Sequence, residues 1–96
     1  MRRVAEAMTL AIEAYPDAKT RVLVENTAGA GRTMGRTARE VADMLSHVPP
    51  PLRPRAGYGL DTCHLFASGY DIRASEAAFG AILDEFEETI GEPPRF

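Results

Sequence analysis

Cysteine is nearly absent from this sequence, and so are the long apolar stretches that mark a membrane protein. Cys63 is the only cysteine among 96 residues, so no internal disulfide can form. No apolar run reaches the length that a membrane-spanning helix needs. The basic start Met1-Arg2-Arg3 is followed by Glu6 and Glu13 rather than by the continuous apolar stretch of a signal peptide. We therefore expect a cytoplasmic protein with no membrane contact.

Positive charge is also in short supply. The chain has 11 Lys and Arg residues against 14 Asp and Glu residues, which gives a net charge of −3 with neutral histidines. Contacts to a phosphate backbone need Lys or Arg placed against it, so this balance by itself gives little support for nucleic-acid binding. The chain is 45% hydrophobic and 26% charged, which is typical of a globular α/β protein and not of a disordered chain.

The apolar pattern of the first half predicts a helix, a strand and a second helix. Apolar residues at every fourth position predict an amphipathic helix over residues 2–14. The apolar run over residues 21–25 is typical of a strand covered on both faces, as in parallel sheets. The capping box Thr37-Ala38-Arg39-Glu40 then begins a helix whose apolar stripe continues to Val48.

The second half continues the same alternation. The three prolines that begin at Pro49 stop the second helix, and Pro54 is expected to keep the connection extended. Residues 56–61 predict the next strand, and a third helix is expected over residues 75–91. The order helix, strand, helix, strand, helix predicts two parallel neighbouring strands.

Acidic residues occupy the same end of both predicted strands. Glu25 ends the first strand, Asp61 ends the second, and His64 follows three residues later. Carboxyl ends of adjacent parallel strands lie together, so these side chains could reach shared or neighbouring metal ions. Carboxylate oxygens and imidazole nitrogens are ordinary zinc ligands. We predict a metal site at Glu25, Asp61 and His64; the alternative is two strand-end acids that cap loop amides and a hydrogen-bonded histidine.

The same motifs carry a family resemblance. Val24-Glu25-Asn26-Thr27-Ala28-Gly29 and Leu60-Asp61-Thr62-Cys63-His64, followed by Gly69-Tyr70-Asp71, resemble the endonuclease IV family of zinc-dependent apurinic/apyrimidinic (AP) endonucleases. The likeness runs from about residue 21 to residue 91. It implies an α/β fold that is part of a TIM-type (β/α)₈ barrel, with about two parallel strands and three helices from the middle of the family's barrel.

The resemblance also implies a function for the complete barrel. Members of the family hydrolyse the phosphodiester 5′ to abasic sites in DNA, using a cluster of three zinc ions and no protein nucleophile. By resemblance, Glu25 would bridge two of the zinc ions, Asp61 would bind one of that pair, and His64 would bind the third. Zinc would be the cofactor, and DNA containing abasic sites the partner, in base-excision repair.

Chain length limits what this function can mean here. A complete (β/α)₈ barrel takes about 250 residues, so residues 1–96 are expected to be a single fragment, from a truncated gene product or an incomplete sequence, that requires the remaining barrel segments. Because its matched ligands cannot complete the cluster, we expect the fragment to be inactive alone. The alternatives are a non-enzymatic or partner-dependent barrel fragment, and a metal-dependent barrel of the sugar isomerase and epimerase kind.

Glycines follow the first predicted strand in a pattern that invites comparison with a dinucleotide-binding loop. Gly29, Gly31 and Gly35 have the spacing G-x-G-x-x-x-G, one residue longer than that fingerprint requires. The glycines are better explained by a tight loop beside the metal site. Ala30 stands in this loop where many members of the resembled family have glutamine.

The remaining candidates are single residues. Arg32, Arg36 and Arg73 follow the predicted strand ends and could face a phosphate backbone, although exposed arginines are common. His47 lies near the end of a predicted helix, where the helix dipole accounts for it without a function. Cys63 is expected to be a buried small thiol.

Overall fold

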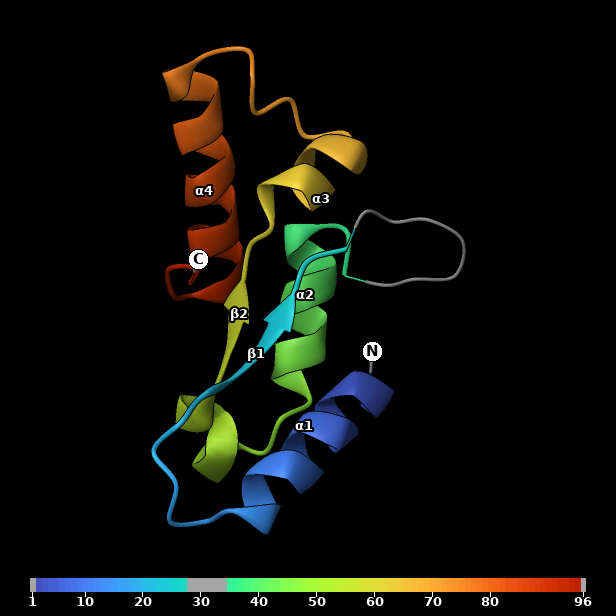
Figure 1. Cartoon of the computed structure of the whole chain (residues 1–96), viewed down its shortest axis with the longest axis vertical. Coiled ribbons are helices and arrows are strands. Elements are labelled where there is room, and N and C mark those ends of the chain that lie inside the picture. Colours follow the sequence, from blue (N-terminus) through green and yellow to red (C-terminus); the bar gives the residue numbers. More distant parts are fainter. Residues whose placement is uncertain (1, 28–34, 96) are drawn as a thin grey trace.

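The computed structural model describes residues 2–27 and 35–95, in which two short strands lie against a layer of helices (Figure 1). No helix in these residues is long and apolar enough to cross a membrane. The elements in chain order are α1 (Arg2–Ala14), β1 (Val22–Glu25), α2 (Ala38–Ser46), the 3-10 helix η1 (Pro50–Arg55), β2 (Ala56–Gly59), α3 (Thr62–Ala67) and α4 (Glu76–Ile90).

The two strands pair in parallel, which confirms the predicted strand arrangement. Val22 lies opposite Ala56, and Glu25 lies opposite Gly59. The main-chain N–H of Asn26 extends the ladder by donating to the Gly59 carbonyl at 3.3 Å. The carboxyl ends of β1 and β2 therefore lie at one edge of the sheet, on the side of α3 (Figure 1).

After α4 the chain returns to the sheet at the other edge of β2. Arg95 forms a parallel bridge with Gly59. Its N–H donates to the Tyr58 carbonyl at 3.0 Å, and its carbonyl accepts from the Leu60 N–H at 3.0 Å. This is the position that a third parallel strand takes after a second crossover helix. The sequence analysis did not predict this contact.

The helices bury one face of the sheet. In Figure 1, α2 lies behind the strands, and α1 and α4 flank it. The ring of Tyr58 on β2 stacks on Phe86 of α4 with centroids 6.2 Å apart. Apolar stripes on the helices thus form one core with the sheet. Its buried side chains include Ala5, Met8, Ile12, Val41, Leu45, Ala56, Tyr58 and Phe86.

The opposite face of the sheet is open in the described part of the chain. Val22 and Val24 pack against the core, whereas Leu23 is 43% exposed and Glu25 lies on the same side as Leu23. The prediction of a strand covered on both faces is therefore wrong for these residues. Successive strand side chains point to opposite faces, and helices cover only one of them. In a closed barrel, the open face would be the interior.

Gly57 makes room for an arginine on this open face. A Cβ atom at Gly57 would lie 2.9 Å from a guanidinium nitrogen of Arg21. That guanidinium donates to the Ala56 carbonyl at 2.7 Å and to the Glu92 carboxylate at 2.8 Å. Arg53 donates to the same two groups at 2.6 and 2.7 Å. The network joins the chain after α4 to the start of β2, and the arginine fills the space that a side chain at Gly57 would occupy.

The predicted helix ends agree with the structure, with one change at α2. The hydroxyl of Thr37 accepts from the Glu40 N–H at 3.2 Å, as expected for a capping box. The Glu40 carboxylate accepts from the N–H of Arg36 at 2.9 Å, one residue before the N-cap. Helix α1 spans its predicted range. Helix α4 begins after the N-cap Ser75 and ends at Gly91, whose φ of 96° is left-handed.

The connections around β2 differ from the prediction. Residues Pro50–Arg55 form η1 instead of an extended segment, because the fixed φ of proline also suits a 3-10 turn. Strand β2 ends at Gly59 and not at residue 61. The next residues begin α3, since the side chain of Asp61 caps that helix. The described residues therefore contain four α-helices where three were predicted.

Candidate metal centre at the carboxyl ends of the strands

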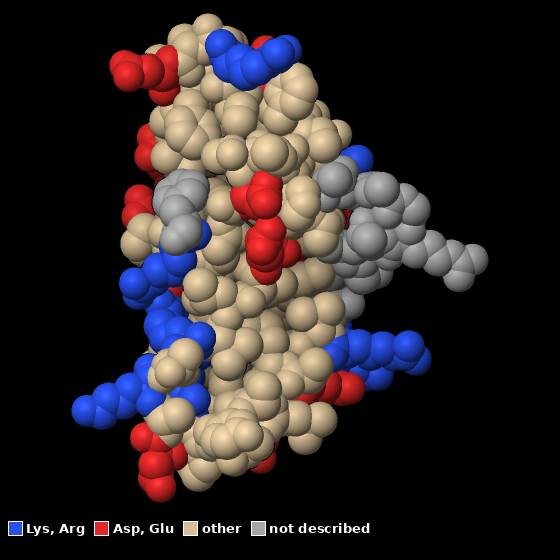
Figure 2. Space-filling model, viewed as in Figure 1, with Lys and Arg blue, Asp and Glu red and all other residues tan. Residues whose placement is uncertain are grey.

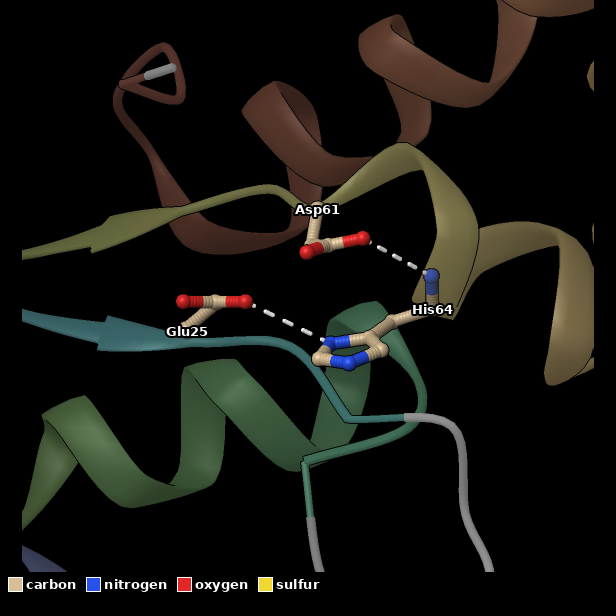
Figure 3. Close-up of side chains that lie close together, drawn as sticks. All are labelled: Glu25, Asp61 and His64. Carbon is tan, nitrogen blue, oxygen red and sulfur yellow. Dashed lines mark hydrogen bonds and ion pairs between the residues drawn. The ribbon is translucent and has the colours of Figure 1, made fainter.

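Glu25 is the last residue of β1, and its carboxylate is accessible at the open face of the sheet. Its side chain is 58% exposed. The strand alternation that buries Val22 and Val24 places Glu25 opposite to them. The carboxylate Oε1 lies 3.4 Å from Nδ1 of His64, which comes from α3 (Figure 3).

Asp61 lies two residues beyond β2 and begins α3 as its N-cap. Its Oδ1 accepts from the main-chain N–H of His64 at 3.0 Å. This hydrogen bond holds the pKa of Asp61 below its usual value, with further help from the imidazole of His64. The side chain is therefore a carboxylate at neutral pH, and one of its oxygens is fixed by the helix while the other can bind a cation.

His64 turns its ring toward the end of β1. The Nδ1 atom lies 2.8 Å from the main-chain carbonyl of Asn26. Because a carbonyl oxygen can only accept a hydrogen bond, Nδ1 must carry the proton. The neutral ring then keeps a lone pair on Nε2, which is the atom that could bind a metal ion.

The three side chains meet at one place, although β1 and α3 are far apart in sequence. Each of Glu25, Asp61 and His64 offers a ligand atom within 4.8 Å of the others. Two carboxylates and one imidazole fit the ligand chemistry of zinc. Zinc is usually four-coordinate, and these three residues are the one such group in the described ranges. The donor set is therefore suitable in kind and incomplete in number.

The surface around these acids is mostly uncharged. Figure 2 shows acidic side chains in the middle of this face, over the strand ends, with uncharged residues around them. Carboxylates in such surroundings favour cations and repel phosphate groups. A shallow cavity of about 260 Å³ lies beside them; it is lined by Leu23, Glu25, Gly59, Leu60, Asp61 and Arg95.

The other predicted residues have varied outcomes. Gly29, Ala30, Gly31 and Arg32 lie outside the described residues, so the predictions on them stay predictions. Gly35 has a φ of 94°, a left-handed value that favours glycine, and its carbonyl accepts from the Thr27 N–H at 3.0 Å.

The isolated candidates are spread over the molecule. Arg36 is exposed just before α2. Arg73 stacks over the ring of Phe66, 4.3 Å from its centroid. His47 caps the C-terminus of α2, as its position predicted. Cys63 is exposed and not buried as expected, because it lies on the solvent side of the short helix α3.

The sequence analysis gave no role to one residue of the site, Asn26. Its side chain is 1% exposed, and it is the one buried polar residue among those described. The amide contacts the main chain of Asp61, and the carbonyl contacts His64. A polar residue directly after a buried strand and next to a candidate ligand was the signal that could have identified it.

Comparison with known proteins identifies the family. Residues 1–95 match the model of the xylose isomerase-like TIM barrel family. The chain belongs to this family, and the α/β barrel fold class predicted from its sequence is confirmed. The parallel strands described above are what such a barrel requires, and the clustered acids lie at the end of the sheet where barrel enzymes place their active sites.

Individual curated proteins within reach of this sequence share one name. The chain is 40% identical over 91 residues to a protein from Chlorobium limicola named probable endonuclease 4. Proteins of the same name from Chlorobium phaeobacteroides and Geotalea daltonii are 41% and 38% identical, also over 91 residues. The matches cover 95% of this chain and 30 to 31% of each relative. The motif resemblance to endonuclease IV is therefore confirmed, and the chain spans under a third of these curated relatives.

Proposed function

We propose that this chain forms part of the barrel of a zinc-dependent AP endonuclease, which hydrolyses the phosphodiester 5′ to abasic sites in DNA. Glu25, Asp61 and His64 would be zinc ligands, and the remaining ligands would come from other barrel segments. The observation that carries the proposal is the meeting of these three side chains, within 4.8 Å, at the carboxyl ends of parallel strands. Barrel enzymes place their active sites at this end.

The three side chains have distinct roles in this proposal. Glu25 projects from the strand, and its side chain is 58% exposed with Oε1 3.4 Å from His64 Nδ1, so it is the carboxylate best suited to bridge two cations. Asp61 has one oxygen committed to α3 and offers the other. His64 turns its protonated Nδ1 toward Glu25, so its Nε2 would bind a different ion from Glu25. When bound, zinc supplies Lewis acidity toward the scissile phosphate.

Electrostatics supports the need for cations at this site. Two carboxylates lie where a phosphodiester would have to approach, and the chain as a whole carries a charge of −3. Without a positive ion, this end of the sheet would repel the DNA backbone. Metal ions at the acids reverse the local charge, so DNA binding and metal binding should be coupled.

A sugar isomerase remains the alternative within the family. Strand-end acids that bind metal ions also suit that chemistry, and the family's description refers to xylose isomerase. The curated relatives with 38 to 41% identity are named as endonucleases, which favours DNA as the substrate. The proposal therefore takes hydrolysis of a phosphodiester as the reaction.

A segment swap tests the proposal directly. The 91 matched residues of the Chlorobium limicola relative are replaced by those of this chain, giving a protein that we call the swapped relative. We expect it to retain zinc and to incise a duplex that contains one abasic site. Asp61→Ala should abolish incision and reduce the zinc content. Asp43→Ala, which removes an exposed acid of α2 outside the cluster, is the matched control and should leave both unchanged.

Two outcomes would count against the proposal. If the swapped relative folds with full zinc content and does not incise the abasic duplex, this segment does not serve an AP endonuclease. If Asp61→Ala and Asp43→Ala have the same zinc content and the same incision rate, Asp61 is not a ligand.

A further inference from the structure

Asn26 contacts both candidate ligands on the α3 side of the site, Asp61 and His64. Its side-chain Oδ1 accepts from the Asp61 N–H at 2.6 Å, and its Nδ2 donates to the Asp61 carbonyl at 3.3 Å. Its own main-chain carbonyl accepts from Nδ1 of His64 at 2.8 Å. Its main-chain N–H donates to Gly59 at 3.3 Å. Every polar group of this buried residue is therefore paired.

The side-chain amide of Asn26 pairs with main-chain groups that a neighbouring strand would otherwise pair with. Strand β2 ends at Gly59, and the chain turns into α3 at Asp61, so the peptide groups of Asp61 have no neighbouring strand to pair with. An amide is both a donor and an acceptor and can satisfy both groups at once. Aspartate cannot donate, and a serine hydroxyl is too short to reach both groups. The site therefore calls for asparagine specifically.

This arrangement fixes both ligands on α3 relative to β1. The two hydrogen bonds of the Asn26 side-chain amide hold Asp61, the N-cap of α3. The hydrogen bond to the Asn26 main-chain carbonyl holds the ring of His64, one turn later. Histidine ligands commonly depend on such a partner for their tautomer and ring orientation. The ring of His64 is 41% exposed, so without the carbonyl it would be free to adopt the Nε2–H tautomer, which predominates for the neutral histidine side chain in water.

We propose that Asn26 is a positioning residue of the metal centre: its side chain locks Asp61, and its carbonyl keeps His64 in the Nδ1–H tautomer with Nε2 available to a metal ion. The metal part of this inference rests on the proposed function, whereas the tautomer part does not. Burial of a polar side chain is costly unless it is fully paired, and here all of the pairing is directed at residues of the site.

The tautomer can be measured on the 96-residue chain without metal. Two-bond ¹H–¹⁵N correlation spectra distinguish the two neutral forms of imidazole, and His47→Gln assigns the only other histidine. Asn26→Ala keeps the main-chain carbonyl but loses both side-chain hydrogen bonds to Asp61, so α3 is no longer held against that carbonyl. We expect His64 to be in the Nδ1–H form in the wild type, and the share of the Nε2–H form to rise in Asn26→Ala. Tyr58→Phe is the matched control, because it also removes one side chain to main chain hydrogen bond, from Tyr58 to Glu92 at 2.8 Å, and should not change the tautomer.

A second variant covers the case in which Asn26→Ala does not fold. Asn26→Ser keeps a polar group that can pair with only one of the two Asp61 groups, so it should give a mixture of the two forms. A wild-type His64 in the Nε2–H form would overturn the inference. So would a pure Nδ1–H form in a folded Asn26→Ala or Asn26→Ser variant.

The metal part is measured on the swapped relative. Zinc affinity, obtained by competition with a chelator, should fall about 10- to 100-fold in Asn26→Ala, as is typical when a residue that supports metal ligands is lost. Tyr58→Phe should stay within about twofold of the wild type. Equal zinc affinity in Asn26→Ala and the wild type would overturn the positioning role. Absence of zinc from the unmutated swapped relative would instead contradict the proposed function, and the tautomer measurement would be unaffected.

Discussion

At the scale of single residues, the candidate ligands owe their chemistry to their neighbours. The carboxylate of Asp61 caps α3 by accepting a hydrogen bond from the His64 N–H. This hydrogen bond both orients the carboxylate and lowers its pKa. The ring of His64 is oriented by a main-chain carbonyl of another element. Glu25 is positioned by its place at the end of β1 and by the 3.4 Å contact between its Oε1 and Nδ1 of His64.

The position of Glu25 leads to a prediction. In the swapped relative, Glu25→Ala should lower the rate of abasic-site incision by more than about 100-fold and reduce the zinc content, because a bridging carboxylate organises two cations. Arg36→Ala removes an exposed side chain that can make at most one phosphate contact, so it should lower the rate by no more than about tenfold and leave zinc unchanged. Incision rates and zinc content of the two variants are measured together. Equal values would remove Glu25 from the metal centre.

At the scale of elements, the ends of the helices carry the stabilising polar contacts. At the start of α2 the Thr37 hydroxyl accepts from the Glu40 N–H, and the Glu40 carboxylate accepts from the Arg36 N–H. The segment after α4 is held by Glu92, which lies between two arginines. These contacts set where each helix meets the sheet. They act on stability without touching the metal centre, so they can be tested separately from activity.

The cap of α2 gives the first element-scale prediction. Thr37→Ala should lower the free energy of unfolding by about 0.5–2 kcal/mol, since the Glu40 N–H loses its acceptor. Thr37→Ser keeps a hydroxyl at the same place and is the control, with an expected loss well below that of alanine. Urea unfolding of both variants measures the difference. Equal stability of the alanine and serine variants would show that the hydroxyl does not cap α2.

The second element-scale prediction concerns Glu92 and its two arginine partners, and its size depends on pH. Burial alone would raise the pKa of Glu92, but the hydrogen bonds and charges of Arg21 and Arg53 outweigh it and lower the pKa below 4.5. A carboxyl group whose pKa is lowered by folding adds stability above its unfolded-state pKa and loses it as the pH falls through the folded-state pKa. Glu92→Gln should therefore cost about 1–2 kcal/mol near pH 7 and progressively less below about pH 4.

Unfolding curves in urea at several pH values test this pH dependence. The control is Glu88→Gln, which neutralises an exposed acid of α4 and should change stability little at any pH. A cost of Glu92→Gln that stays constant from neutral to acidic pH would contradict the role given to the ion pairs.

At the scale of the whole molecule, only one face of the sheet is covered in the described residues. Helices cover one face, and Leu23 and Glu25 lie on the open face. A barrel of this family closes that face with its other strands, whose ends supply further site residues. The chain spans 30 to 31% of its curated relatives, so under the proposed function the remaining metal ligands would come from other barrel segments.

We therefore predict that the 96-residue chain, tested by itself, has no appreciable AP-endonuclease activity and binds zinc weakly. Three ligands leave the usual four-coordination of zinc incomplete, so water and competing chelators can reach the ion. The purified chain, supplied with zinc, should leave an abasic duplex intact over a time in which the Chlorobium limicola relative digests it. Efficient incision that is lost in Asp61→Ala would refute this prediction and would point to assembly of a complete site from several copies.

The sequence alone determined the order of the main elements and the identity of the clustered side chains. Apolar periodicity and helix caps are local properties, so α1, the start of α2 and α4 could be predicted closely. The parallel pairing of residues 21–25 and 56–61 followed from the alternation of strand and helix. The motifs containing Glu25, Asp61 and His64 named residues that the structure does bring together.

Only the tertiary structure decided how those residues are held. Helix α3 was missed because its N-cap, Asp61, was assigned to a strand, and the capping role of Asp61 depends on where the strand ends. The role of Asn26 and the tautomer of His64 depend on contacts between residues 35 to 38 positions apart. The space beside Gly57 in β2 is likewise filled by a distant residue, Arg21. Local patterns determine which elements form, whereas contacts between distant segments fix the orientation of side chains, and no local pattern records them.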